Sequence, residues 1–206
     1  MVWFWPASDL LSVINQFIQN FHNDHPDVNF TIMQCNLPKA YRSLDEEVCD
    51  FSITIFENNL PSNLNVLPFH KSDIVFCVGK NSPLVQKEYI DYEDLKDFPL
   101  ILSQENAYIS KLLKTEFYKQ NIVPNIIMYS VQLNLIHEMV LDNRCGAFIL
   151  REIAEKWSDV GIVPLKNKIP ITFSLIWRKD RYLSKKGKKM IDFISTHKNN
   201  IQESET

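Results

Sequence analysis

The chain has 206 residues, of which 45% are hydrophobic and 12% aromatic, enough to bury one large core or two smaller ones. Its net charge of −3 excludes a basic, nucleic-acid-binding surface extending over the whole chain. No apolar run approaches the roughly 18 residues of a membrane span, and the four glycines are scattered, so they form no phosphate-binding loop.

The hydrophobic pattern predicts alternating strands and helices from the first residues onward. Alternating or continuous apolar runs predict strands over residues 2–5, 28–33, 49–56, 65–69, 73–79, 99–102, 124–129, 145–150, 161–165 and 171–177. Helical spacing and capping residues predict helices over residues 8–23, 37–44, 91–96, 108–120, 131–141, 151–157 and 184–197. Because the first sixty residues follow the order of parallel βαβ units, the fold class is α/β.

No Gly/Ser-rich linker divides the chain, so two lobes would have to be joined by strands that cross between them. The sequence suggests crossings near residues 69–73 and 167–171. We therefore expect one lobe to comprise residues 1–70 plus 168–206, and the other to comprise residues 71–167.

The strand predicted over Cys49–Phe56 ends in a polar turn, Glu57–Pro61. Loops at the carboxyl ends of strands form the ligand crevice of open α/β sheets, which makes Ile55, Phe56 and Glu57 candidates for its floor. The alternative is that this segment is an ordinary core strand.

The four cysteines are widely spaced, lie in apolar runs and form no C-x-x-C pair: Cys35, Cys49, Cys77 and Cys145. This distribution predicts reduced, buried thiols in a cytoplasmic protein rather than disulfides or a zinc site. The apolar stretch Met1–Trp5 is too short for the hydrophobic region of a signal peptide.

Five short segments carry a resemblance to a known family. In chain order they are His25-Pro26-Asp27-Val28, Asp50-Phe51-Ser52-Ile53, Asn81-Ser82-Pro83-Leu84, Ile136–Val140 with Cys145–Phe148, and Trp177-Arg178-Lys179. Their order and spacing resemble the effector-binding domain of LysR-type transcriptional regulators over nearly the whole chain. Two departures are Asn143, where the family usually has glycine, and Leu150-Arg151, where it usually has Leu-Pro.

The resemblance implies a two-lobed fold similar to type 2 periplasmic binding proteins, with a small, anionic metabolite bound between the lobes. The positions that match the ligand-binding loops are Ala7, Ser8, Asn36, Ile55, Ser103, Gln104, Ser130 and Phe148. It implies no catalytic residue, cofactor, metal or membrane partner. It also implies a homodimer in which helix 8–23 of one copy lies against the second lobe of the other.

Family members carry an N-terminal winged helix-turn-helix, and nothing in these 206 residues corresponds to it. We therefore expect DNA to be bound only through a missing N-terminal domain, in a protein that was either excised or naturally truncated. The acidic balance of this chain agrees with that expectation, since phosphate contacts need basic side chains.

Chemistry supports part of the implied site independently of the resemblance. Helix starts at Ser8 and after Ser103 would present free N–H groups and a positive dipole end to a carboxylate. The alternative is that both serines only cap their helices. For Asn36, a turn residue is the favoured alternative.

Other patterns are weaker. The segment Arg178–Lys189 holds seven basic residues and one acid, which favours a solvated helix face over a nucleic-acid patch. His22 and His25 straddle a helix end, which disfavours a metal site. No G-x-S-x-G or H-E-x-x-H motif occurs. The remaining alternatives are an enzyme on the same fold, such as a dehydratase or deaminase, and a secreted solute-binding protein.

Overall fold

A computed structural model describes residues 2–5, 11–35, 37–55 and 61–197. The chain folds into two compact units: unit 1 is Met1–Lys71 with Ile171–Thr206, and unit 2 is Ser72–Pro170. The chain therefore passes between the units twice, within one long strand and at the start of another. The sequence placed these two passages after residues 70 and 167.

In the sheet of unit 1, the first strand of the chain lies between two parallel neighbours. Its elements are β1 (Val2–Trp5), α1 (Leu11–Asp24), β2 (Thr31–Gln34), α2 (Leu37–Asp45), β3 (Phe51–Ile55), the first half of β4 (Leu64–Gly79), β9 (Pro170–Arg178) and α6 (Lys185–His197). Strand β1 pairs in parallel with β2 and β3, and β9 pairs antiparallel with β3. The parallel βαβ order predicted for the first sixty residues is confirmed.

Aromatic side chains hold α1 and α6 against each other in unit 1. The ring centroids of Phe21 and Phe193 lie 5.2 Å apart, and Phe17 lies 5.4 Å from Phe193 and 5.9 Å from Phe69. Burying each such ring contributes about 1.5–3 kcal/mol. The apolar face predicted for the first helix is thus covered, at Phe17 and Phe21, by residues of its own unit.

Helix α2 covers a second hydrophobic cluster in unit 1. Its buried residues Ala40 and Leu44 pack with Cys49, Leu64 and Ile176. Residues Ala40 and Leu44 are one helical turn apart, which places both on the same face of α2. This spacing explains why the short segment 37–45 folds as a helix on the sheet.

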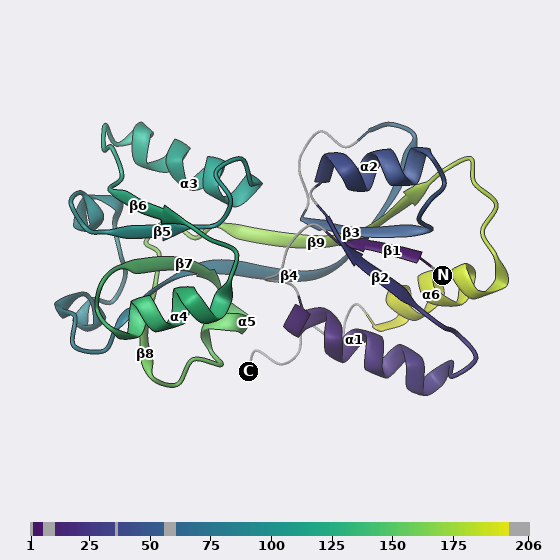
Figure 1. Cartoon of the computed structure of the whole chain (residues 1–206), viewed down its shortest axis with the longest axis horizontal. Helices are drawn as coiled ribbons and strands as arrows, with labels where there is room; N and C mark the ends of the chain where they lie inside the picture. Colours follow the sequence, from purple (N-terminus) through teal and green to yellow (C-terminus); the bar gives the residue numbers. More distant parts are fainter. Residues whose placement is uncertain (1, 6–10, 36, 56–60, 198–206) are drawn as a thin grey trace. The chain divides into compact units, whose positions relative to one another are not determined.

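Unit 2 repeats the same plan with different strands (Figure 1). Its elements are the second half of β4, the 3₁₀ helices η2 (Pro83–Gln86) and η3 (Tyr92–Leu95), β5 (Leu100–Leu102), α3 (Tyr108–Lys119), β6 (Ile126–Tyr129), α4 (Leu133–Leu141), β7 (Gly146–Leu150), α5 (Arg151–Ala154) and β8 (Val160–Pro164). Strand β5 pairs in parallel with β6 and β7, and β4 pairs antiparallel with β7 and β8. As predicted, Asp91 caps η3, and the cap is a reciprocal capping box with Asp94.

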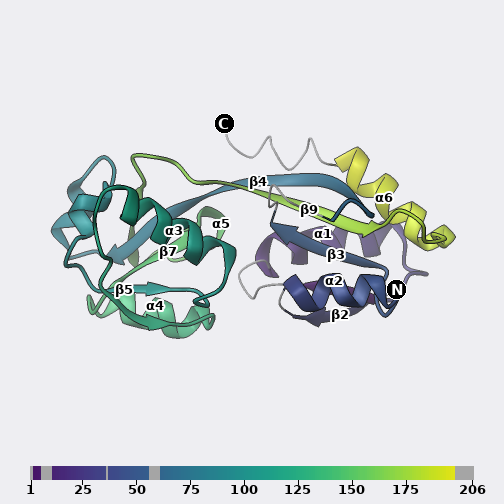
Figure 2. The same ribbon diagram turned by 90° about the horizontal axis from the view of Figure 1, so that it is seen from above.

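The strand order makes the loops after β5 and β6 diverge. The chain moves from β5 to its neighbour β6 through α3, then returns through α4 to β7 on the other side of β5. Helices α3 and α4 accordingly lie on opposite faces of the sheet of unit 2 (Figures 1 and 2). Such a reversal is the topological switch point at which open α/β sheets bind ligands.

Four details of the sequence prediction are wrong. The strand predicted over 28–33 is β2, Thr31–Gln34, so residues 28–30 precede it. The strands predicted over 65–69 and 73–79 are one continuous strand, β4, because hydrogen bonds satisfy the polar side chains of Ser72 and Asp73 within it. Helix α4 begins at Leu133 with Gln132 as its N-cap residue, not at Val131. Helix α5 ends at Ala154 rather than near Trp157, whose N–H closes a turn on the Ala154 carbonyl.

The four cysteines are free thiols, as predicted. Cys49, Cys77 and Cys145 are buried, and Cys35 is half-buried. Desolvation by burial raises the pKa of Cys49 and of Cys77 to about 12 and that of Cys145 to about 11. These three thiols are therefore protonated and unreactive at neutral pH. Within the described ranges, no helix is both long and apolar enough to cross a bilayer.

Candidate functional site

The predicted site residues fall in both units. Ala7, Ser8 and Asn36 lie outside the described residues, as do Phe56 and Glu57. Ile55 is half-buried at the end of β3, opposite Phe173 of β9. The Thr54 hydroxyl donates to the Ile55 carbonyl over 3.0 Å.

Three predicted residues meet at the carboxyl ends of β5 and β6 in unit 2. Strands β5 and β6 are paired so that Leu102 lies opposite Tyr129, and the Ser130 N–H donates to the Leu102 carbonyl over 2.9 Å. Ser103, Gln104 and Ser130 therefore follow the ends of two neighbouring parallel strands. This is the switch point defined by the diverging α3 and α4.

An open depression of about 390 Å³ lies at this point. Its lining residues are Gln104, Met128, Tyr129, Ser130, Val131, Gln132 and Leu135. The lining combines two amides, two hydroxyls and three apolar side chains, the mixture expected of a small-molecule site. The sequence predicted Gln104 and Ser130 among these residues.

The two serines of this site do not cap the helices that follow them. The Ser103 hydroxyl is 2.9 Å from the hydroxyl of Ser110, and the Ser130 hydroxyl accepts from the Gln132 N–H over 3.1 Å. The N-cap residues, Ala107 of α3 and Gln132 of α4, make no side-chain capping hydrogen bond. Both helix starts therefore keep the partial positive charge that favours an anion.

Phe148 lies apart from the depression, in the core of unit 2. Only 8% of it is exposed, and its ring lies 5.3 Å from Phe76 and 6.1 Å from Phe117 in edge-to-face packing. The structure thus brings Gln104 and Ser130 together, with Ser103 beside them. Phe148 instead packs against buried rings in the core of unit 2.

Sequence reasoning missed Lys114 and Tyr129. The Lys114 ammonium lies 4.9 Å from the centroid of the Tyr129 ring and 3.4 Å from Oε1 of Glu105. Tyr129 first, and then Glu105, raise the pKa of Lys114, so the side chain is protonated. No local pattern reveals this arrangement, because Lys114 and Tyr129 meet only through the packing of α3 on β6.

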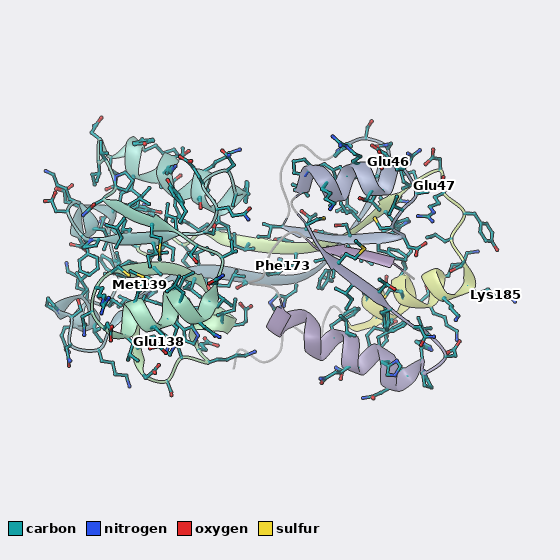
Figure 3. The ribbon with its side chains drawn as sticks, viewed as in Figure 1. Glu46, Glu47, Glu138, Met139, Phe173 and Lys185 are labelled. Atoms are coloured by element: carbon teal, nitrogen blue, oxygen red, sulfur yellow. The ribbon has the colours of Figure 1, made fainter. Side chains whose placement is uncertain are left out.

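Three of the seven basic residues in the segment Arg178–Lys189 pair with acids of unit 1. Arg178 contacts Asp45 and Asp180. Arg181 pairs with Asp50 over 3.3 Å, and Lys189 with Asp27 over 3.6 Å. Lys185, at the start of α6, projects away from the sheet (Figure 3). This pairing favours the predicted solvated face over a nucleic-acid patch.

No group of three or more metal-ligating side chains occurs in the part of the chain that the structure describes. The His25 ring instead packs 4.7 Å from Phe21.

Residues 9–199 of the chain match the family model of the LysR substrate binding domain. The chain belongs to the LysR substrate-binding domain family. Among curated relatives of this LysR domain is the HTH-type transcriptional regulator YwbI of Bacillus subtilis. The two sequences are 29% identical over 174 residues, an alignment that covers 80% of this chain and 56% of YwbI. The chain is also 22% identical over 127 residues to a probable nitrogen assimilation transcriptional activator of Synechocystis. This alignment covers 61% of this chain and 40% of the activator.

The chain thus spans about half the length of these curated relatives. Solved structures of LysR proteins share the fold. The effector-binding domain of QuiR in complex with shikimate has a TM-score of 0.80 at 22% identity, covering 97% of this chain and 96% of that one. The regulatory domain of CcmR from Synechocystis in complex with 2-PG has a TM-score of 0.85 at 14% identity, covering 97% and 98%.

Full-length CbnR complexed with target DNA has a TM-score of 0.79 at 11% identity, covering 95% of this chain and 69% of that one. The LysR domain therefore has the two-lobed, periplasmic-binding-protein-like fold that the sequence predicted.

Proposed function

We propose that this chain is the effector-sensing domain of a LysR-type transcriptional regulator, and that it binds a small, anionic metabolite. The observation that carries the proposal is the depression in unit 2. It lies at a topological switch point and combines Gln104, Ser130 and Gln132 with the start of α4, which lacks a side-chain cap. Hydrogen-bond donors and positive dipole ends suit an anionic oxygen.

The ligands of related domains support a small molecule as effector. QuiR is described in complex with shikimate, and CcmR in complex with 2-PG. A depression of about 390 Å³ suits a metabolite of that size class. The positions predicted from the sequence in unit 1, Ala7, Ser8, Asn36 and Ile55, stay predictions, as does Phe148 in unit 2.

We propose further that the ligand changes transcription by biasing the shape of a longer regulator. A coupling of about 1–3 kcal/mol between effector and DNA binding would suffice. DNA contacts would come from the part of the curated relatives' length that this chain does not cover. The relatives are regulators rather than enzymes, so we expect the ligand to be released unchanged. The free thiols fit a reducing, cytoplasmic setting.

A thermal-shift screen with small carboxylates, amino acids and phosphorylated sugars tests the proposal. A ligand at 100 times its Kd adds about 2.7 kcal/mol to the stability of the folded state, which raises the Tm. We expect Gln104→Ala and Ser130→Ala to abolish that rise. Ser195→Ala, an exposed serine of α6, serves as the matched control and should keep it.

A ligand-induced rise that survives both variants would place the effector elsewhere. Conversion of the ligand during incubation, followed by NMR, would replace the sensing function with an enzymatic one.

We also propose that two copies of the chain associate side by side, with α1 of one copy against unit 2 of the other. Strand β2 carries Ile32 and Met33, which are 44% and 40% exposed, and β6 carries Ile127, which is 48% exposed. In the described part of the chain, β2 pairs only with β1, and β6 only with β5. These exposed apolar side chains on the edge strands of both units support a pair of copies that covers them.

A further inference from the structure

The depression in unit 2 lacks a cationic side chain among its lining residues. Its seven lining residues are uncharged: Gln104, Met128, Tyr129, Ser130, Val131, Gln132 and Leu135. Helix starts and amides can orient an anion, but a full positive charge nearby would select it over a neutral molecule. The residues at the rim therefore decide whether the site prefers anions.

Lys114 contacts one of these lining residues, Tyr129. Its ammonium is held between the ring of Tyr129, which lines the depression, and the carboxylate of Glu105, which follows the lining residue Gln104. Lys114 is the seventh residue of α3, and helical side chains lean toward the N-terminus of their helix. The ammonium is thus directed toward the end of α3 at which the turn bearing Gln104 lies.

The pairing of Lys114 with Glu105 is loose. The N···O distance of 3.4 Å exceeds the 2.7–2.9 Å of a tight charge-assisted hydrogen bond. The Glu105 side chain is 65% exposed, whereas that of Lys114 is 19% exposed. A surface pair of this kind changes an equilibrium constant by at most about fivefold, so a second anion can replace Glu105 at little cost.

We propose that the Lys114 ammonium is the cation that an anionic effector engages at this depression, and that Glu105 is the counter-ion that the effector displaces. This inference rests on the proposed effector-sensing function and adds to it the charge of the ligand group and the residue that selects it. Tyr129 holds the ammonium in place through its ring face. In the absence of ligand, Glu105 neutralises Lys114.

The exchange of counter-ions predicts opposite effects for the two partners. Lys114→Gln should weaken anion binding about tenfold or more, because it removes a charged hydrogen-bond donor. Glu105→Gln should tighten it about two- to fivefold, because it removes the competing carboxylate. In the double variant Lys114→Gln/Glu105→Gln, anion binding should be as weak as in Lys114→Gln alone. Glu105 and the effector compete for the Lys114 ammonium, so without that ammonium the change at Glu105 has no effect on anion binding.

Shikimate, its uncharged methyl ester and inorganic phosphate are suitable probes, titrated into the 206-residue chain. Backbone amide shifts of Gln104 and Ser130 report occupancy of the depression, and the Lys114 side-chain signal reports the charge contact. Shikimate and phosphate should follow the pattern above, whereas binding of the ester should change less than twofold in every variant.

The pair Lys119–Glu116, 2.6 Å apart on the same helix, provides matched controls. Lys119→Gln and Glu116→Gln should leave all three probes unaffected. Lys114→Arg should retain most of the anion affinity, which separates charge from helix stability.

Amide shifts at Gln104 and Ser130 that persist unchanged in Lys114→Gln would overturn the inference while leaving the effector site intact. Weaker anion binding by Glu105→Gln would also overturn the inference and leave the effector site intact. If no probe shifts these amides or Lys114 in any variant, including Glu105→Gln, both the inference and the assignment of this depression as the effector site fail.

Discussion

At the scale of single residues, Asn143 explains one departure of the sequence from its family. It follows α4 with a φ of 57°, in the left-handed region that usually requires glycine. Asparagine is among the few other residues that adopt this conformation readily. Its side chain lies over Gly79: a Cβ added to Gly79 would be 2.1 Å from Oδ1 of Asn143. The two positions are therefore coupled.

We expect Gly79→Ala to lower the free energy of unfolding by about 1 kcal/mol, the low end of overpacking costs, because the Asn143 side chain can rotate away. Asn143→Gly should remove that penalty. Urea unfolding of both single variants and the double variant measures the coupling. Gly187→Ala is the control: its added Cβ would meet nothing closer than 3.4 Å, and alanine favours the helix. If Gly79→Ala lowers the free energy of unfolding equally with asparagine and with glycine at position 143, the two positions are not coupled.

At the scale of elements, β4 shows how paired side chains keep a strand continuous. The guanidinium of Arg151, at the start of α5, donates to both carboxylate oxygens of Asp73 over 2.6 and 2.7 Å. The Ser72 hydroxyl donates to Glu152 over 2.5 Å. From the sequence alone, this region was predicted as two strands, over residues 65–69 and 73–79. Contacts 78 to 80 residues away in the chain keep this segment extended instead.

Arg151→Met should destabilise the fold by about 1–3 kcal/mol, because it leaves the carboxylate of Asp73, 16% exposed, without its bidentate partner. Hydrogen exchange at the amides of Ser72–Ile74 should accelerate by a corresponding factor. The exposed pair Arg144–Asp142 provides the comparison, and Arg144→Met should cost less than about 0.5 kcal/mol. If Arg151→Met and Arg144→Met lower the free energy of unfolding by similar amounts, the Arg151–Asp73 pair adds no specific stability to β4.

At the scale of the whole molecule, the apolar strand edges predict self-association. Ile127→Lys and Ile32→Lys should each shift the sedimentation profile toward monomer without lowering the Tm, because both side chains are about half exposed. Val48→Lys, 52% exposed but outside the strands, should leave the profile unchanged. A strictly monomeric parent at high micromolar concentration would rule out the proposed pairing.

Much of the fold could be predicted from local patterns. Phe51, Ile53 and Ile55 alternate with Ser52 and Thr54, and this period of two identified β3 without further information. The βαβ order identified the parallel strands of unit 1, and short motifs placed the chain in its family. Errors fell where a polar segment is satisfied by distant partners, as at Ser72 and Asp73, or where helix ends shifted by two residues, as at Ser130.

The sequence by itself determined the class of fold, its two-lobed plan, the family, and the positions of Gln104 and Ser130 after two strands. Hydrophobic periodicity and turn residues are local, and a single sequence displays them directly. Only the tertiary structure decided that Ser103 pairs with Ser110, that Phe148 belongs to the core, and that Lys114 lies over Tyr129 beside Glu105. These contacts depend on how α3 packs on its sheet, and that packing is a sum of many weak interactions between residues far apart in the chain.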